Sequence, residues 1–160
     1  MLIWSCCIVP ICSQAFVFNF RAFDDQHDIR VSVSTTASQF RSRFMSALDT
    51  WEDVCPYITI SAIQGSNIYL YSDIGVDSDA YAVCYYVDDE TNNIVLYRPF
   101  TRLSVLQQDE TIVHEIGHAM GLDHCQEEKN EISVMRRLGF NSKPYPLADD
   151  IEGINILYGW

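Results

Sequence analysis

Three histidines, a glutamate and a glycine fall within one short stretch of the chain, at spacings that suit a metal ion. His114 and His118 are four positions apart. On a helix both imidazoles therefore lie on one face, one turn apart, and can reach a single ion. Glu115 lies beside them and can hold a metal-bound water. Gly121 lets the helix end and the chain turn, because glycine adopts left-handed backbone angles, and His124 returns as a third ligand.

Three protein ligands leave the fourth position of a tetrahedral Zn²⁺ open for water, which distinguishes a catalytic site from a structural one. We therefore predict one catalytic Zn²⁺, bound by His114, His118 and His124. Such an ion polarises a water and the scissile carbonyl, while Glu115 takes the proton of the water and delivers it to the departing amine. The alternative is three solvated or core histidines near a helix end. The fourth histidine, His27, lies in a polar run and is expected at the surface.

The stretch 114–124 resembles the zinc motif of the metzincin metallopeptidases, and its amino-acid sequence is most similar to that of the matrixins. Met135 matches their Met-turn, which implies that it lies beneath the three imidazoles; by sequence alone an ordinary core methionine is equally compatible. Residues 147–159 resemble the closing helix of matrixin catalytic domains, and the whole resemblance covers roughly residues 28–159. It implies a metzincin-like α+β fold: a twisted mixed β-sheet with a long N-terminal helix, an active-site helix and a C-terminal helix.

The resemblance also implies a zinc-dependent endopeptidase whose substrate is an extended polypeptide. The substrate would add as another strand to an edge strand over residues 80–87. We expect four of its residues to bind substrate: Ala80, Tyr81, Ala82 and Val83. Main-chain pairing depends little on the side chains of the substrate, so a side-chain pocket near the metal must select the residue after the cleaved bond. Pro144 and Tyr145 are candidate lining residues of that pocket.

The chain departs from the matrixin pattern in two informative places. Tyr81 stands where the family has a histidine of its structural zinc site, so we expect no second zinc ion. Arg136 and Arg137 follow Met135 where the family has Tyr-Pro, which predicts a specificity pocket of different shape. The endopeptidase hypothesis has two competitors: a catalytically silent metzincin-fold binding module, and a zinc hydrolase of a non-peptide amide. Retention of Glu115 argues against the silent module.

Length, net charge and the apolar N-terminus indicate the number of domains, the kind of binding partner and the cellular location. A chain of 160 residues forms one domain. Its net charge of −12 disfavours binding to nucleic acid. Residues 1–15 are apolar and end in small residues before Phe16, so we predict a signal peptide, a secreted protein and a catalytic domain over residues 16–160. A membrane anchor and a buried N-terminal strand are the alternatives; Pro10 and Asn19 argue against the anchor. A monomer is the default expectation.

Cysteines and acidic residues leave further alternatives open. Beyond the leader, Cys55, Cys84 and Cys125 are odd in number, so at most one disulfide forms. Cys125 follows a metal ligand and could join a disulfide, bring a thiolate to the zinc, or simply be buried. Six loop carboxylates could bind Ca²⁺, although a solvated surface is the favoured interpretation. They are Asp73, Asp77, Asp79, Asp88, Asp89 and Glu90.

The surrounding elements must position these residues. Hydrophobic alternation predicts strands over residues 29–34, 57–63, 67–72, 80–87 and 94–97. Thr36 with Gln39 indicates a capping box for a helix to about Val54. Ser104 with Gln107 indicates the same for the metal-binding helix. The buried face of that helix is predicted to carry Ile112, Ile116 and Ala119, and a terminal helix is expected to start near Asp149.

Overall fold

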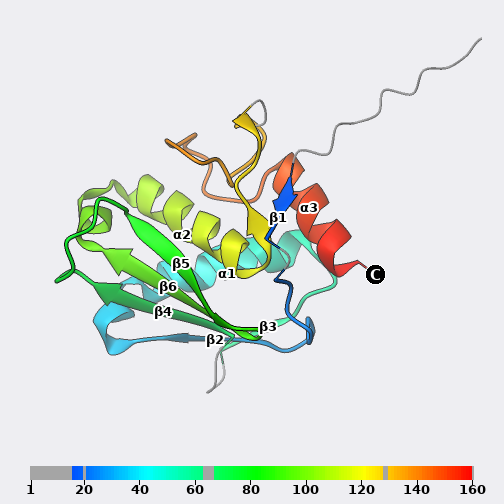
Figure 1. The fold of residues 1–160 in the computed structure, drawn as a ribbon, viewed down its shortest axis with the longest axis horizontal. Coiled ribbons are helices and arrows are strands. Elements are labelled where there is room, and N and C mark those ends of the chain that lie inside the picture. The colour runs from blue at the N-terminus through cyan, green and yellow to red at the C-terminus, as the bar shows by residue number, and fades with distance from the viewer. Residues whose placement is uncertain (1–15, 20, 63–66, 128–129, 160) are drawn as a thin grey trace, which may run out of the picture.

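The main sheet of the fold is mixed and has five strands (Figure 1). The computed structural model describes residues 16–159 except residues 20, 63–66 and 128–129. The predicted signal peptide, residues 1–15, therefore lies outside the described residues. The strand order is β3-β2-β4-β6-β5. These strands are β2 (Ile29–Val33), β3 (Ile60–Ser61), β4 (Ile68–Asp73), β5 (Ala82–Asp88) and β6 (Thr91–Tyr97).

Strand β5 is an edge strand and runs antiparallel to β6, whereas the other neighbours in the sheet pair in parallel. Its ladder partner in the described part of the chain is β6 alone. Strands β5 and β6 are joined by a tight turn, which allows antiparallel pairing without a crossover. The register shifts between Tyr86 and Asp88, as expected of a β-bulge near a strand end. An edge strand of this kind offers unpaired backbone groups to an added strand.

Three helices complete the α+β fold of the described residues, in the predicted order: α1 (Arg41–Val54), α2 (Val105–Ala119) and α3 (Ala148–Tyr158). Helices α1 and α2 pack against each other, and α2 lies along β5 (Figure 1). The indole N–H of Trp51 in α1 donates to the carbonyl of Val113 in α2 over 3.0 Å, deep in the core. The predicted fold class, with its mixed sheet and its long N-terminal, active-site and C-terminal helices, is confirmed.

The capping box predicted for α1 is wrong. A 3-10 helix, η1 (Thr35–Phe40), precedes α1, and Ser34 caps it by accepting the N–H of Thr36. The chain thus enters its first helical turn two residues earlier than the Thr36 and Gln39 pattern indicated. The buried face of α1 carries Phe44, Leu48 and Trp51.

Several predicted strands have other bounds in the structure; the strand expected over residues 80–87, for example, begins two residues later, as β5. Of the strand expected over residues 57–63, β3 is formed and residue 63 lies outside the described residues. The N–H groups of Ile58 and Thr59 bond to Cys55 and Gln26 and lie before the paired residues of β3. The strand expected over residues 94–97 begins earlier, at Thr91, since the turn after β5 is shorter than predicted.

Helix α2 and the turn after it follow the sequence-based prediction. The side chain of Ser104 accepts the N–H of Gln107, and the Gln107 side chain accepts the N–H of Ser104, so the capping box is present. Gly121 has φ +104°, a conformation that favours glycine. The turn leads into β7 (Leu122–Asp123), which pairs with β1 (Val17–Phe18).

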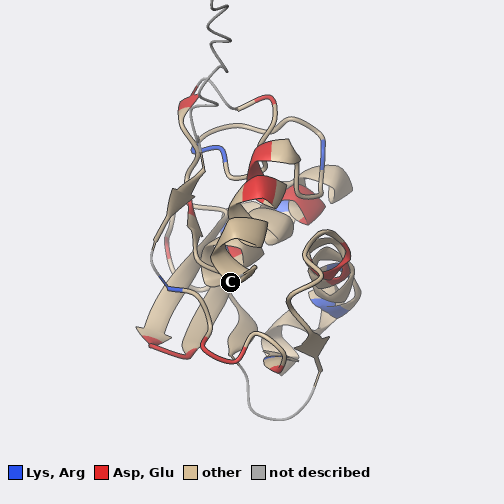
Figure 2. Cartoon of the chain, turned by 90° about the vertical axis from the view of Figure 1, so that its right-hand side faces the viewer, with Lys and Arg blue, Asp and Glu red and all other residues tan. Residues whose placement is uncertain are grey.

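Surface charge in the described residues is spread rather than concentrated. Figure 2 shows Asp and Glu in red on loops and helices at several levels of the view, with fewer Lys and Arg between them. His27 is exposed, as predicted. None of the helices in the described part of the chain combines the length and the apolar character that crossing a bilayer requires.

Gly117 of α2 lies where the helix meets the core most closely. A Cβ there would lie 2.9 Å from Cζ2 of Trp51 and closer still to Sδ of Met135. We expect Gly117→Ala to lower the free energy of unfolding by about 1–3 kcal/mol, because overpacking outweighs the gain in helix propensity. Denaturant unfolding measures this. Gly75→Ala is the control: its Cβ would meet only Asp73 Oδ1, at 3.6 Å. Equal stabilities of the two variants would contradict the prediction.

Candidate metal centre and its cleft

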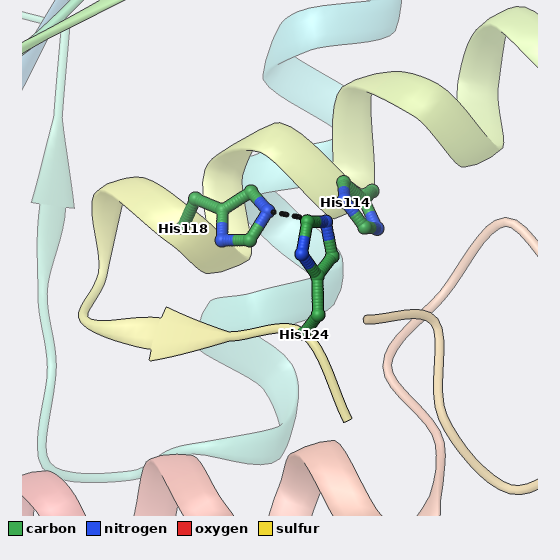
Figure 3. Close-up of side chains that lie close together, drawn as sticks. All are labelled: His114, His118 and His124. Atoms are coloured by element: carbon green, nitrogen blue, oxygen red, sulfur yellow. Dashed lines mark hydrogen bonds between the residues drawn. The ribbon is translucent and has the colours of Figure 1, made fainter. Parts of the chain in front are cut away.

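The three predicted ligands come together at the C-terminal end of α2 (Figure 3). One ring nitrogen from each of His114, His118 and His124 lies within 4.8 Å of the others. The Nε2 atoms of His118 and His124 are 3.3 Å apart. Two nitrogens that bind one zinc ion at tetrahedral angles are separated by about 3.3 Å, given a Zn–N bond of about 2.0–2.1 Å. The imidazole cluster therefore fits a zinc ion.

Backbone carbonyls orient two of the rings. Nδ1 of His114 lies 2.9 Å from the carbonyl oxygen of Val134, and Nδ1 of His118 lies 2.9 Å from that of Leu122. A ring that donates from Nδ1 keeps its Nε2 lone pair for a metal. Nδ1 of His124 lies 3.7 Å from the carboxylate of Asp123. The two backbone carbonyls thus hold Nε2 of His114 and of His118 toward the common centre.

The rings are held in the neutral form that binds metals. Burial, together with the smaller effect of the neighbouring imidazole of His118, lowers the pKa of His114 to about 3. Burial also lowers the pKa of His118 and of His124. Metal binding requires unprotonated imidazole, so a buried triad does not need to lose protons before it binds an ion.

Glu115 faces the same cleft as the triad. Its side chain is 7% exposed and lines both cavities that flank the histidines. Burial raises the pKa of Glu115 to about 7, although a hydrogen bond from the backbone N–H of Cys84 opposes the shift. A carboxyl group with a pKa near neutrality can both accept and release a proton at physiological pH.

The segment 133–135 passes under the metal-binding helix. Met135 is buried, and its sulfur packs against the face of α2 at Gly117, next to His118. The carbonyl of Met135 accepts the N–H of Cys125, which joins the segment to the chain just after the third histidine. This position agrees with the Met-turn expectation, while the role of Met135 at a metal stays a prediction.

Asp150 is a site residue that sequence reasoning missed. Its side chain is 1% exposed and accepts the backbone N–H groups of Val134 (2.7 Å) and Leu147 (2.8 Å) as well as the hydroxyl of Ser133. The sequence indicated only that a carboxylate suits the start of α3. The structure adds that Asp150 holds Val134, whose carbonyl orients His114.

Glu110 is a second residue that was missed. It lies on the metal-binding helix and is 3% exposed, which is unusual for a glutamate. Its carboxylate accepts the N–H groups of Asn141 (2.8 Å) and Ser142 (2.9 Å). Ser142 has φ 63°, so the chain turns sharply at the residue whose N–H donates to Glu110. Glu110 therefore fixes the loop that follows Met135.

Two cavities flank the triad. The first, of 660 Å³, is bounded by the N-terminal segment and by Ala82 and Val83 of β5. The second, of 680 Å³, is bounded by residues 79–82, by α2 and by residues 136–140. All four residues predicted to bind substrate line the cleft: Ala82 and Val83 belong to β5, whereas Ala80 and Tyr81 precede it. Their role in substrate binding stays a prediction.

Pro144 and Tyr145 do not line either of the cavities that flank the triad, so this prediction is wrong. Pro144 borders a separate cavity against α1, and Tyr145 is exposed. The physical reason is the turn at Ser142, which Glu110 fixes and which directs the following residues away from the cleft.

Two of the cysteine alternatives are also wrong. Cys55, Cys84 and Cys125 are free thiols, so no disulfide joins them. The sulfur of Cys125 lies 3.6 Å from Oδ1 of Asn130 and is not part of the histidine cluster. Burial raises the pKa of Cys125, and it raises that of Cys84 to about 12, which opposes thiolate formation. Burial is thus the fate of Cys125 that the structure supports.

The loop carboxylates give no support for calcium. Within the described ranges, the histidine triad is the only group of three or more candidate ligands close enough to share an ion. Asp73 and Asp88 instead accept the N–H groups of Gly75 and Glu90 in local turns.

Comparisons with known proteins agree with the site. The matrixin family model (Peptidase_M10) matches residues 101–159. Among solved structures, myroilysin is similar with a TM-score of 0.63 at 15% identity, over 91% of this chain and 98% of that one. The structure titled "GM1 bound form of the ECX AB5 holotoxin" also has a TM-score of 0.63 at 15% identity, over 90% and 84%. No curated protein matches the chain.

The family match covers both the metal-binding helix and Met135, and the structural likeness extends over nearly the whole described chain. At 15% identity the likeness shows the fold alone. Together the findings support a metzincin-like fold and a zinc metallopeptidase in general.

Proposed function

We propose that this chain, which carries a matrixin-like domain, is a secreted zinc-dependent endopeptidase. The observation that carries the proposal is the convergence of three neutral imidazoles, His114, His118 and His124, with Glu115 beside them in one cleft. A site that served only to hold the fold together would be closed by a fourth protein ligand and would have no use for the carboxylate.

The zinc ion would be held by Nε2 of the three histidines, since Nδ1 of His114 and of His118 already bonds to a backbone carbonyl. When bound, zinc supplies Lewis-acid polarisation and makes a water acidic near neutral pH. The carbonyls of Val134 and Leu122 keep the rings oriented, so that the ligands need little rearrangement to bind.

Glu115 moves the protons. Its carboxylate, with a pKa raised to about 7 by burial, accepts a proton from the attacking water. The N–H of Cys84 fixes the carboxylate as a hydrogen-bond acceptor on the β5 side of the cleft. The proton then passes from Glu115 to the departing amine nitrogen, because an expelled amine must be protonated before the peptide bond breaks.

An extended polypeptide is the substrate class that the cleft favours. Strand β5 lies along α2 with Ala82, Val83 and Cys84 at the cavity wall. A peptide that added to the free edge of β5 would pass in front of the triad, with its main chain paired to the strand. Secretion follows in this proposal from the apolar leader, residues 1–15, removed before Phe16. We propose that the enzyme acts as a monomer, with no nucleic-acid or membrane partner.

The test is zinc content measured together with proteolysis. We expect purified protein to contain about one zinc ion per chain and to cleave casein, with at least a hundredfold loss of activity on chelation and recovery when zinc is restored. His114→Gln is expected to abolish both zinc binding and cleavage. His27→Gln, at the exposed histidine outside the triad, is the matched control.

The alternatives give different results. Folded, zinc-loaded protein that cleaves neither casein nor gelatin would favour the silent binding module. Cleavage confined to non-peptide amides would favour the hydrolase alternative. Chelator-resistant proteolysis would overturn the proposal altogether.

A further inference from the structure

We propose that the second cavity beside the triad takes an acidic side chain of the substrate, from a residue that flanks the cleaved bond. We call this space the arginine cavity: it has a volume of 680 Å³ and is lined by Arg136 and Arg137 together with His114, Glu115, Tyr81 and Phe140. The inference rests on the proposed function and adds to it the chemical class of the preferred substrate.

Arg136 is a buried cation that forms no salt bridge with a carboxylate of the described residues. Its side chain is 9% exposed, and Nη2 donates to the carbonyl of Asn130. Its Nε atom is buried and has no hydrogen-bond partner in the described part of the chain. Burial of an unpaired guanidinium opposes folding, and an anion from a ligand would relieve that cost.

Arg137 adds a second cation to the same wall. It is exposed, and it forms no salt bridge with any carboxylate of the described residues. The charge of Arg136 helps to lower the pKa of His114, and that of Arg137 helps to lower the pKa of His124, so both charges lie close to the triad. A guanidinium group suits the planar, bidentate recognition of a carboxylate, and two residues that line the cavity carry one.

Two other arginines of this acidic chain form salt bridges, while the exposed arginines at positions 21, 41, 98 and 102 form none within the described residues. Arg30 pairs with Asp28 at 3.1 Å, and Arg43 pairs with Asp109 at 2.7 Å. With 22 Asp and Glu against 10 Lys and Arg, acidic partners are plentiful. Among the arginines that the structure describes, Arg136 is the buried one, and no carboxylate of those residues forms a salt bridge with it or with Arg137.

Three acidic residues also line the arginine cavity, but none of them forms a salt bridge with Arg136 or Arg137 in the described residues. The carboxylate of Glu110 is used by the N–H groups of Asn141 and Ser142. Glu115 accepts the N–H of Cys84 beside the triad. Asp79 is exposed and belongs to the segment before β5.

The rest of the wall suits the stem of a glutamate. The rings of Tyr81 and Phe140 pack with their centroids 5.7 Å apart, and Val134 is buried beneath the triad. A glutamate side chain could lay its methylene groups along these apolar surfaces and extend its carboxylate to the guanidinium groups, as amphipathic side chains commonly do. The cavity thus offers both an apolar flank and a cationic end.

The experiment uses matched peptides that contain one cleavable bond. Two pairs compare Glu with Gln, one pair at the position before the cut and one at the position after it, and each peptide is made with a free and with an amidated C-terminus. We expect kcat/KM to be at least tenfold higher for Glu than for Gln in one of the two pairs. We expect amidation to leave that ratio unchanged, since the recognised group is a side chain.

Arg137→Gln is expected to reduce the Glu-to-Gln ratio to below about threefold, because it removes a charge from the exposed part of the wall without disturbing the core. Arg102→Gln, at an exposed arginine outside the cavity, is the matched control and should leave the ratio at its original value. Casein cleavage by each preparation shows separately that the enzyme is active.

A binding measurement keeps the inference testable if no peptide is cleaved. The Glu115→Gln protein, loaded with zinc, should bind a fluorescein-labelled Glu peptide at least fivefold more tightly than the Gln peptide in fluorescence anisotropy. The wild-type protein could fail to cleave casein while the Glu115→Gln protein shows this binding preference. That result would overturn the proposed function and support the cavity assignment. Equal cleavage and equal binding of the Glu and Gln peptides would overturn the inference, as would a preference that disappears when the C-terminus is amidated.

Discussion

Replacing Glu115 with glutamine is expected to lower kcat/KM for casein-derived peptides by about 10²–10⁴-fold, the usual contribution of a positioned general base. The amide is nearly isosteric, so the triad and the cleft keep their shape. It can no longer accept a proton from the attacking water or return one to the leaving amine. Peptide kinetics measure the loss, and zinc analysis should give the same metal content for wild type and variant.

The conservative control for Glu115 is Glu152→Gln, at an exposed carboxylate on α3. It should change kcat/KM by less than about twofold, because surface substitutions away from a site have small effects. If Glu115→Gln kept more than a tenth of wild-type activity with full zinc occupancy, another group would have to be the base. A variant that lost its zinc would instead indicate a structural role for the carboxylate.

Replacing Asp150 with asparagine is expected to lower the free energy of unfolding by about 2–4 kcal/mol, since it weakens several hydrogen bonds in a fully buried place. The carboxylate accepts the N–H groups of Val134 and Leu147 and the hydroxyl of Ser133. An amide offers one acceptor oxygen, and its NH₂ group would face one of those donors. Thermal and denaturant unfolding measure the change.

The same variant should also bind zinc about 10–100-fold more weakly, as is usual when a group that orients a ligand is lost. The path is short: Asp150 holds the N–H of Val134, and the carbonyl of Val134 orients Nδ1 of His114. Competition with a chromogenic chelator measures the affinity. Asp53→Asn, at an exposed position of α1, is the matched control and should alter neither quantity. If the Asp150→Asn protein were destabilised but bound zinc with unchanged affinity, the proposed influence of Asp150 on His114 through Val134 would be contradicted.

Local spacing allowed the metal centre to be predicted. Ligands four residues apart on a helix must share a face, and the capping pair Ser104 and Gln107 determines where that helix begins. Gly121, with its positive φ, ends the turn where His124 is needed. The ligand spacing, the capping box and the glycine turn each involve residues a few positions apart, so they can be predicted from the sequence.

Relations between distant residues were decided by the tertiary structure. Glu110 bonds to residues 31 and 32 positions away, and Asp150 to a residue 16 positions away. These contacts depend on the path of the irregular segment 125–147, where no hydrophobic period indicates which side chain faces the helix. That path excluded Pro144 and Tyr145 from the cleft and brought Arg136 and Arg137 into it.

The amino-acid sequence by itself thus determined the chemistry of this protein: three imidazoles and a carboxylate at helical spacing, and the helix that presents them. The tertiary structure alone decided which distant side chains support that chemistry: Asp150 bonds to Val134, and Glu110 bonds to the loop at Ser142. The physical reason is that helical periodicity and capping act over a few residues, whereas a loop takes its course from hydrogen bonds and burial between segments that meet only when the chain is folded.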